Sequence, residues 1–311
     1  MPGLEVIDMR RYLTALNLAL GLAVIAVTAC GSSQSLAPGT QSVVSAPVRV
    51  AHTGLGTVGY RVVGSGPPLV LIMGYGSTME DWDPRLVHAL ALHHRVVMFD
   101  NSGVGRTQEL PQPFSVDAMA DQASALIAAL GLGRPDVLGW SMGGMIAQAL
   151  AVLHPAQVRH LVLCATYPGS GQAVMPPVAE RQGASDFPAS QAAALNAFKA
   201  AISEYPPAPP ASSGVKGLQV LAMSDWQTDS DAAGRETARI SAPTLIADGA
   251  SDQLDPLGND HTLAREIPGA RLVLYPGAGH AFLFQDWTGF AALVNAFLAG
   301  GQSLAAAEAL E

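Results

Sequence analysis

Residues 138–145 read LGWSMGGM, a stretch in which three glycines surround a single serine, Ser141. The residues before it, PDVLGW, have the character of a strand, and residues 142–153 are expected to form a helix. A sharp turn would explain the glycines, but a turn that presents the serine explains the whole stretch. A helix that begins at Met142 directs its free N–H groups and the positive end of its dipole toward the serine oxygen.

The composition limits the class of protein. The chain has 311 residues, of which 49% are hydrophobic and 13% are charged, which suits one large domain or a domain with an insertion. The formal charge of -9 argues against a nucleic-acid partner, because phosphate binding needs a basic face. The sequence has no H-E-x-x-H motif, no cysteine–histidine cluster and no G-x-x-x-x-G-K loop, so we expect no metal site and no cofactor.

Short apolar runs alternate with helical patterns from Val48 onward, and one helix is expected at 115–130. Runs such as PPLVLIMG are continuously apolar, as expected for strands that are covered on both faces. This alternation predicts an α/β fold with a mostly parallel sheet and helices on both faces. Eight segments are expected to form the strands: 48–53, 58–64, 67–74, 95–100, 135–140, 158–166, 242–249 and 270–277.

One region, residues 168–240, interrupts this alternation. It contains no convincing strand and carries several proline clusters, the densest at 205–210. Residues 190–203 and 215–225 have helical patterns, and a structureless loop of this length would be unusual in a compact domain. We therefore expect a helical cap over the sheet, and this region is called the cap below. The two flanking segments, 48–167 and 241–300, are expected to form the core.

A serine nucleophile needs a general base, and His280 is the candidate. It ends the glycine-rich stretch PGAGH directly after the strand expected at 270–277. That position is the carboxyl edge of the sheet, where open α/β folds bind their ligands. Of the other histidines, three are expected to be structural or to face solvent: His93, His94 and His154. His160 lies at the start of an expected strand, and His261 lies on a helical stretch.

The base in turn needs an acid that orients it, and the loop after the strand at 242–249 offers three aspartates. Asp248 lies close to the end of the strand, where it can shape the turn. Asp252 is the preferred acid, and Asp255 is the fallback. The order serine, aspartate, histidine along the chain is the order found in α/β-hydrolases.

The chain from about Thr53 to Phe297 resembles an α/β-hydrolase-fold enzyme with a helical cap. GWSMGG resembles the nucleophile elbow of that family, GASDQLDP its acid loop and GAGH its histidine loop. DNSGVGRT, at 100–107, resembles the D-x-R-G-x-G-x-S turn, with Ser102 in place of the usual arginine. In the family that turn is mainly structural, so no chemistry is assigned to it.

The resemblance also implies an oxyanion hole. In the family it is formed by the N–H after the nucleophile and by an N–H from the loop after the third strand, which are here those of Met142 and Tyr75. Met73 replaces the histidine that the family usually places before the glycine of this loop. The oxyanion donors are backbone N–H groups, so this change does not remove them. The sequence does not show how the loop is anchored without the histidine.

These features predict a serine hydrolase that acts on small carboxylic esters or related acyl compounds. A proline-iminopeptidase-like aminopeptidase is an alternative, since Glu180, Glu204 and Asp225 of the cap could face a free amine. A cofactor-free haloperoxidase or perhydrolase would use the same triad. The alternative from another class is a ligand-binding protein that retains the fold without catalysis. The sequence does not fix the substrate or the oligomeric state.

The first thirty residues resemble a bacterial lipoprotein signal. Arg10 and Arg11 precede an apolar run, 13–29, and the run ends in VTAC, which resembles a lipobox. The resemblance implies cleavage of residues 1–29, lipidation of Cys30, export by the Sec or the Tat route, and anchoring on the outer side of the bacterial cell membrane. An uncleaved transmembrane anchor is the alternative.

Residues 30–47 are mostly small and polar, which predicts a flexible tether between the lipid and the folded domain. The second cysteine, Cys164, lies in an expected strand. With Cys30 lipidated it would have no disulfide partner, so we expect it to be a core residue.

Overall fold

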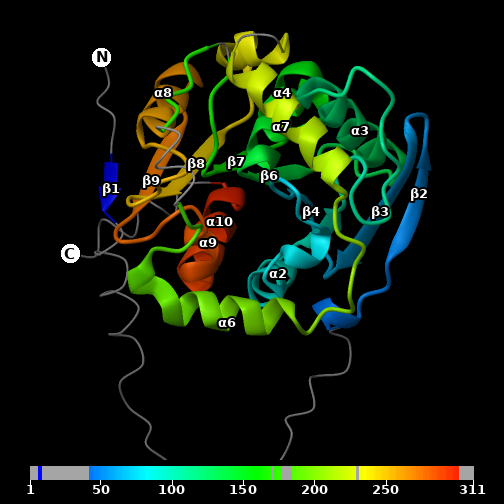
Figure 1. Ribbon diagram of the computed structural model, residues 1–311, viewed down its shortest axis with the longest axis horizontal. Coiled ribbons are helices and arrows are strands. Elements are labelled where there is room, and N and C mark those ends of the chain that lie inside the picture. Colours follow the sequence, from blue (N-terminus) through cyan, green and yellow to red (C-terminus); the bar gives the residue numbers. More distant parts are fainter. Residues whose placement is uncertain (1–5, 9–41, 170, 177–183, 229–230, 301–311) are drawn as a thin grey trace, which may run out of the picture.

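The computed structural model describes residues 6–8, 42–169, 171–176, 184–228 and 231–300. Its centre is a nine-stranded sheet with the order β1-β9-β8-β7-β6-β4-β5-β3-β2, in which β1 and β2 lie at opposite edges (Figure 1). The strands are β1 (Val6–Asp8), β2 (Arg49–Thr53), β3 (Gly56–Val63), β4 (Pro68–Ile72), β5 (Arg95–Phe99), β6 (Asp136–Trp140), β7 (Leu161–Cys164), β8 (Thr244–Gly249) and β9 (Arg271–Tyr275).

The sheet is mostly parallel. Only the β2–β3 and β3–β5 pairs are antiparallel, and every other neighbouring pair is parallel. The predicted eight-stranded, mostly parallel sheet is therefore confirmed in β2–β9. The ninth strand, β1, pairs in parallel with β9 and lies within the segment predicted to be cleaved as a leader. Without that segment the sheet would end at β9.

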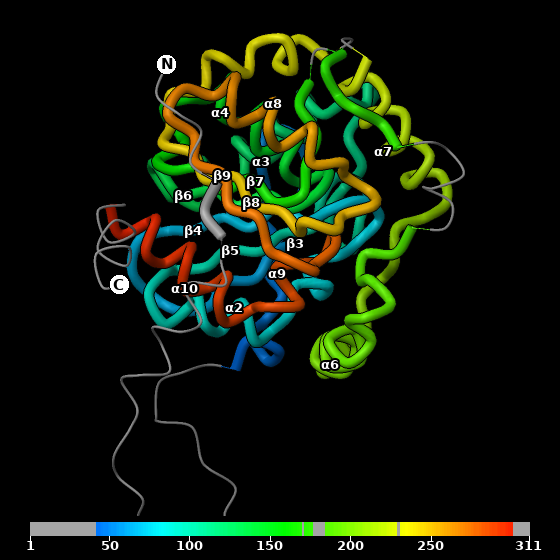
Figure 2. Tube along the Cα trace, turned by 90° about the vertical axis from the view of Figure 1, so that its left-hand side faces the viewer, coloured from blue at the N-terminus to red at the C-terminus, as the bar shows by residue number. Residues whose placement is uncertain are grey.

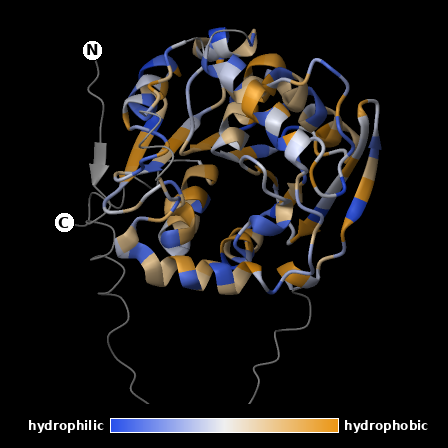
Figure 3. Cartoon of the chain, viewed as in Figure 1, coloured by the Kyte–Doolittle hydropathy of each residue, from blue (hydrophilic) through white to orange (hydrophobic). Residues whose placement is uncertain are grey.

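The central strands are apolar on both faces, as the sequence pattern predicted. All residues of β6 and β8 are buried, and β8 and β9 appear mainly in the hydrophobic colours of Figure 3. Side chains alternate between two hydrophobic clusters: Leu69 and Leu71 of β4 pack in one, whereas Val70 and Ile72 pack in the other. This alternation follows from the two-residue period of a strand.

Helices cover both faces of the sheet. One cluster contains side chains of α2, α9 and α10, and the other contains side chains of α3, α4 and α8. The bounds of these helices are α2 (Pro84–Ala91), α3 (Val116–Ala129), α4 (Met142–Leu153), α8 (Gly258–Glu266), α9 (Phe282–Gln285) and α10 (Trp287–Leu298).

Several helices begin at polar caps that the sequence provides. The Asp83 carboxylate accepts from the Arg85 N–H at 2.9 Å, and Pro84 occupies the first turn of α2. Ser115 caps α3 by accepting from the N–H of Ala118 at 3.1 Å. Helix α2 was not among the predicted helices, although the Asp-Pro pair is a start signal for one.

The cap contains the two helices that the sequence predicted. These are α6 (Ala192–Ile202) and α7 (Ser213–Gln227), with the short 3₁₀ segments η4 (Ala189–Gln191) and η5 (Ala233–Arg239), and no strand occurs in the described part of 168–240. Helix α6 packs against α2 and α9, and α7 packs against α3 and α4. Figure 2 shows α6 and α7 together on one side of the sheet.

The predicted tether needs a correction at its end. Residues Val43–Ser45 form the 3₁₀ segment η1, and Val43 and Ala46 are buried in a core cluster. The Arg61 guanidinium also donates to the Ala46 carbonyl oxygen. The prediction of a free tether up to residue 47 was wrong for this part, because two apolar side chains suffice to dock it.

The N-terminal predictions fall on residues that the structure does not cover. Arg10, Arg11, the apolar run at 13–29 and Cys30 all lie outside the described residues. Among the residues that are described, no helix combines the length and the apolar character that crossing a membrane requires. Cys164 is a free, buried cysteine in β7, as predicted.

Candidate active site

Ser141 lies at a sharp turn between β6 and α4, as the opening stretch predicted. Its backbone has φ 57° and ψ -123°, a conformation that costs a side-chain-bearing residue about 1–3 kcal/mol. A Cβ on Gly139 would lie 2.2 Å from the Gly143 carbonyl oxygen, and a Cβ on Gly143 would lie 2.1 Å from that of Ile72. Both glycines are therefore required by the close approach of the turn to itself and to β4.

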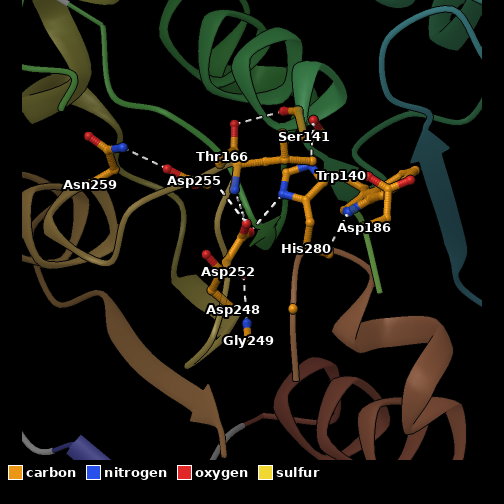
Figure 4. Close-up of polar contacts among 12 residues, drawn as sticks. Trp140, Ser141, Thr166, Asp186, Asp248, Gly249, Asp252, Asp255, Asn259 and His280 are labelled. Carbon is orange, nitrogen blue, oxygen red and sulfur yellow. Dashed lines mark hydrogen bonds and ion pairs between the residues drawn. The ribbon is translucent and has the colours of Figure 1, made fainter. Parts of the chain in front are cut away.

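Three polar side chains meet at this turn, each from a different loop (Figure 4). His280 Nε2 lies 2.9 Å from Ser141 Oγ, and His280 Nδ1 lies 2.7 Å from Asp252 Oδ2. The imidazole thus bridges the hydroxyl and the carboxylate, in the geometry that proton transfer from a serine requires. The structure brings together the serine, the base and the preferred acid that were predicted from the sequence.

The bridging imidazole and its carboxylate are shielded and held in place. The side chain of Asp252 is 0% exposed and that of His280 is 6% exposed. The second oxygen of Asp252 accepts from the N–H groups of Leu254 at 2.7 Å and Asp255 at 2.9 Å. The Trp140 indole N–H donates to the carbonyl oxygen of His280 at 3.0 Å. These bonds leave the imidazole little freedom to rotate.

Burial and charge act in opposite directions on this pair. Burial lowers the pKa of His280, but the negative charge of Asp252 and the hydrogen bond to it raise that pKa to about 9. Burial raises the pKa of Asp252, but the charge and hydrogen bond of His280 outweigh it and lower the pKa below its ordinary value. Both directions describe a carboxylate that stabilises an imidazolium.

The turn has a further contact that the sequence analysis missed. Thr166 lies just after β7, and its hydroxyl donates to the Ser141 carbonyl oxygen at 2.7 Å. A Cβ on Gly144 would lie 2.6 Å from the Cβ of Thr166, so the third glycine of the opening stretch makes room for this side chain. No local sequence signal marks Thr166, because it lies 25 residues from its partner.

Behind Asp252 lies a cluster of three buried aspartates, Asp248, Asp255 and Asp260, with one oxygen of each within 4.8 Å of the others. Burial raises the pKa of all three, and that of Asp260 reaches about 8. Four of their oxygens have no hydrogen-bond partner among the described residues. The three carboxyl groups lie close enough to one another to ligate a cation, and burial favours the neutral form of each.

Asp255, the fallback acid, belongs to this cluster. Its Oδ1 accepts from the Asn259 amide at 2.6 Å, and its backbone N–H donates to Asp252. It therefore contacts the preferred acid through its main chain, while its side chain points to Asn259 (Figure 4).

The two expected oxyanion donors flank Ser141. Met142 is the first residue of α4 and is buried, and Tyr75 lies in the loop after β4, with 40% of its surface exposed. A Cβ on Gly74 would lie 3.3 Å from the Cβ of Ser141, which brings this loop against the turn. Among the described residues, no hydrogen bond uses the backbone N–H of Met142 or of Tyr75.

The remaining histidines are bound elsewhere or lie at the surface. His154 lies 2.7 Å from Asp121, and His160 lies 2.8 Å from Asp136. His94 lies 3.1 Å from the Asn295 side chain. These partners lie away from the Ser141 turn, and for His94 and His154 this agrees with the structural roles predicted for them.

Comparison with known proteins identifies the family. Residues 67–286 match the family model described as the alpha/beta hydrolase fold. The chain therefore belongs to the α/β-hydrolase fold family, and it is an enzyme of the hydrolase class.

The relatives agree with this class. The RutD protein of Caulobacter sp. (strain K31), named for carbamate hydrolysis, is 30% identical over 272 residues, which cover 78% of this chain and 96% of that protein. The pimeloyl-[acyl-carrier protein] methyl ester esterase of Nitrosomonas europaea is 28% identical, with coverage of 73% and 94%. Among solved structures, an alpha/beta hydrolase fold protein from Chitinophaga pinensis has a TM-score of 0.73 at 25% identity, with coverage of 84% and 100%.

Proposed function

We propose that the protein is a serine hydrolase that cleaves small carboxylic esters or related acyl compounds through an acyl-enzyme. The observation that carries this proposal is the continuous contact from Ser141 Oγ through the His280 ring to Asp252, at 2.9 and 2.7 Å. The names of the relatives include a methyl ester esterase and a protein named for carbamate hydrolysis. These names support hydrolysis of an ester or a related acyl bond.

The roles of the residues follow from this contact. Ser141 Oγ attacks the acyl carbon while His280 Nε2 takes the hydroxyl proton, and Asp252 stabilises the imidazolium. The N–H groups of Tyr75 and Met142 stabilise the oxyanion of the tetrahedral intermediate. His280 then gives its proton to the leaving alkoxide as the C–O bond breaks. Water then attacks the acyl carbon while His280 Nε2 takes its proton, and His280 returns that proton to Ser141 Oγ as the bond from Oγ to the acyl carbon breaks.

A cluster of aromatic side chains lies beside His280 and makes its surroundings apolar, which favours apolar substrates. The Trp140 ring lies 5.5 Å from the His280 ring and 5.1 Å from the Phe284 ring. Phe284 stacks at 4.7 Å on Phe198 of the cap, which contacts Phe187 at 5.5 Å. We expect kcat/KM to rise with the first carbons of the acyl chain, because each buried methylene contributes about 0.8 kcal/mol.

The carboxylates that the sequence named for the aminopeptidase alternative provide no buried partner for an amine in the described part of the cap. Glu204 and Asp225 are exposed, and Glu180 lies outside the described residues. A buried ammonium needs such a partner. Prolyl and alanyl anilides are therefore expected to be much poorer substrates than short acyl esters. A preference for the anilides that is lost on changing Glu204 or Glu180 would favour the peptidase instead.

The experiment that tests the proposal is Ser141→Ala. We expect it to abolish both ester hydrolysis and covalent labelling by a fluorophosphonate probe, with an unchanged thermal unfolding temperature. Ser224→Ala, which changes an exposed serine on α7, is the matched control and should keep both activities. A wild-type protein that is neither active nor labelled would instead favour the non-catalytic binding protein. Perhydrolase activity uses the same residues and is separated by assaying hydrogen peroxide as the acyl acceptor.

The N-terminal motif adds a proposal about location. The protein is exported, cleaved before Cys30 and held on the outer side of the bacterial cell membrane by lipid on that cysteine. Two acyl chains anchor stably where one does so only marginally. Mass spectrometry of the membrane fraction should find Cys30 modified and the buried Cys164 unmodified. An unmodified N-terminus upstream of Cys30 would contradict the proposal.

A further inference from the structure

A buried glutamine lies on the face of α7 that packs against the core. The buried positions of this helix are Val215, Gln219, Ala222 and Trp226, which recur at helical spacing and form one stripe. Gln219 is 0% exposed. A buried amide costs free energy unless protein groups replace its hydrogen bonds to water. The contact that this side chain makes is therefore informative.

Gln219 contacts the loop that carries a proposed oxyanion donor. We call residues 73–78 the oxyanion loop. Gln219 Oε1 accepts a hydrogen bond from the Gly76 N–H at 2.8 Å, between residues 143 positions apart in the sequence. Gly76 directly follows Tyr75 and has φ +69°, so the backbone reverses at this point. The bond from the cap thus holds the peptide unit that adjoins the Tyr75 N–H.

A second amide holds the other end of the same loop. The Asn101 side chain donates to the Met73 carbonyl oxygen at 2.7 Å. Asn101 is 2% exposed and Met73 is 0% exposed. Asn101 belongs to the turn after β5, which the sequence analysis treated as structural. This contact anchors the loop at the position where Met73 replaces the histidine of the family.

We propose that Gln219 is a positioning residue for the oxyanion hole, which it holds from the cap while Asn101 holds it from the core. The inference rests on the proposed function, because it assigns the Tyr75 N–H to the oxyanion. Its consequence is that the donor is in place only when α7 is seated on the core. The Gln219 Nε2 group has no partner among the described residues, so the bond made by Oε1 is the contact that matters.

The expected effect is on turnover rather than on substrate binding. Oxyanion donors act when charge develops, and removal of one donor costs about 10²–10³ in kcat. Loss of the Gly76 bond displaces a donor without removing it, so we expect a loss of about tenfold in kcat. KM should stay within about twofold, because the substrate in its ground state does not use the oxyanion contact.

The experiment compares three variants in the full chain with p-nitrophenyl butanoate as substrate. Gln219→Met keeps the length of the side chain and removes the acceptor. Gln219→Glu keeps an acceptor oxygen facing Gly76 and should restore most of kcat. Gln227→Met makes the same change on the same helix, off the buried stripe, and should leave kcat unchanged. Amide hydrogen exchange at Gly76 should be slow in wild type and fast in Gln219→Met.

Each outcome decides the inference. An unchanged kcat in Gln219→Met, a loss confined to KM, or an equal loss in Gln219→Glu would overturn it. Should Gln219→Met fail to fold, unprotected exchange of the Gly76 amide in wild type would overturn it as well. If wild type cleaves no ester and takes up no fluorophosphonate, the proposed function fails, and this inference with it. If wild type is active and the Gln219 variants match it, only this inference fails.

Discussion

The buried carboxylate of Asp252 lies beside the cluster of three buried aspartates, and the two differ in the groups that face them. Asp252 meets His280 at 2.7 Å and accepts two backbone N–H bonds. Asp260, in the cluster behind it, is also fully buried, but its carboxyl group faces those of Asp248 and Asp255 instead of an imidazole. Burial acts on both, yet the pKa of Asp252 is lowered and that of Asp260 is raised to about 8.

This difference shows that the charge of a buried carboxyl group depends on the groups that face it and not on its degree of burial. Burial disfavours the ionised form of either group, and only a positive charge with directed donors reverses this. The predictions below test whether the two groups differ in this way.

The largest effect is expected from Asp252→Asn. An amide facing Nδ1 favours the wrong tautomer of the His280 ring and removes the charge that stabilises the imidazolium, so kcat should fall by about 10⁴. Asp255→Asn should cost far less, because the side chain of Asp255 contacts Asn259 rather than His280. The measurement is kcat for ester hydrolysis in both variants. If Asp255→Asn were the more damaging change, the two aspartates would have exchanged roles.

A smaller but distinctive effect is expected in the pH dependence. A general base must be unprotonated to accept the serine proton, and the pKa of His280 is about 9. The value of kcat/KM should therefore rise with pH and reach half its limit near pH 9, above the ordinary histidine pKa of about 6.5. In Asp252→Asn the residual activity should have a lower midpoint, because the main charge that raises this pKa is gone. Equal midpoints in the two proteins would contradict the pairing.

The sequence predicted the parts of the site that depend on local chain geometry. Ser141 and its glycines were identified because a strand, a sharp turn and a helix leave a pattern within eight residues. His280 and Asp252 were identified because parallel strands bring the loops at their carboxyl ends to one edge of the sheet. These rules need no knowledge of side-chain packing.

The contacts missed by sequence reasoning join residues of ordinary type across long separations. Thr166 reaches Ser141 over 25 residues, and Gln219 reaches Gly76 over 143. Nothing in the local sequence distinguishes this glutamine from one that faces solvent. The same holds for Asp260, which lies in the first turn of α8 and meets Asp248 only after folding. Such contacts are set by helix docking, which periodicity does not specify.

The smallest effect is expected in the pH dependence of stability, through Asp260. Its pKa is raised from 3.8 to about 8 on folding, so the native state keeps a proton that the unfolded state has released between those values. Its contribution to the free energy of unfolding is thus full below about pH 4 and is lost as the pH rises to about 8. One such group gives a slope of at most about 1.4 kcal/mol per pH unit.

Asp260→Asn should lessen this slope. The asparagine amide does not titrate, and it can donate to Asp248 as a protonated carboxyl does. The free energy of unfolding of the variant should therefore increase relative to that of wild type as the pH rises from 5 to 8. Urea unfolding at several pH values measures the difference, with the exposed Asp225→Asn as the control that should follow wild type. A wild-type stability that increases from pH 5 to 8 while Asp260→Asn becomes relatively weaker would mean that Asp260 is ionised in the native protein. The cluster would then resemble Asp252 rather than contrast with it.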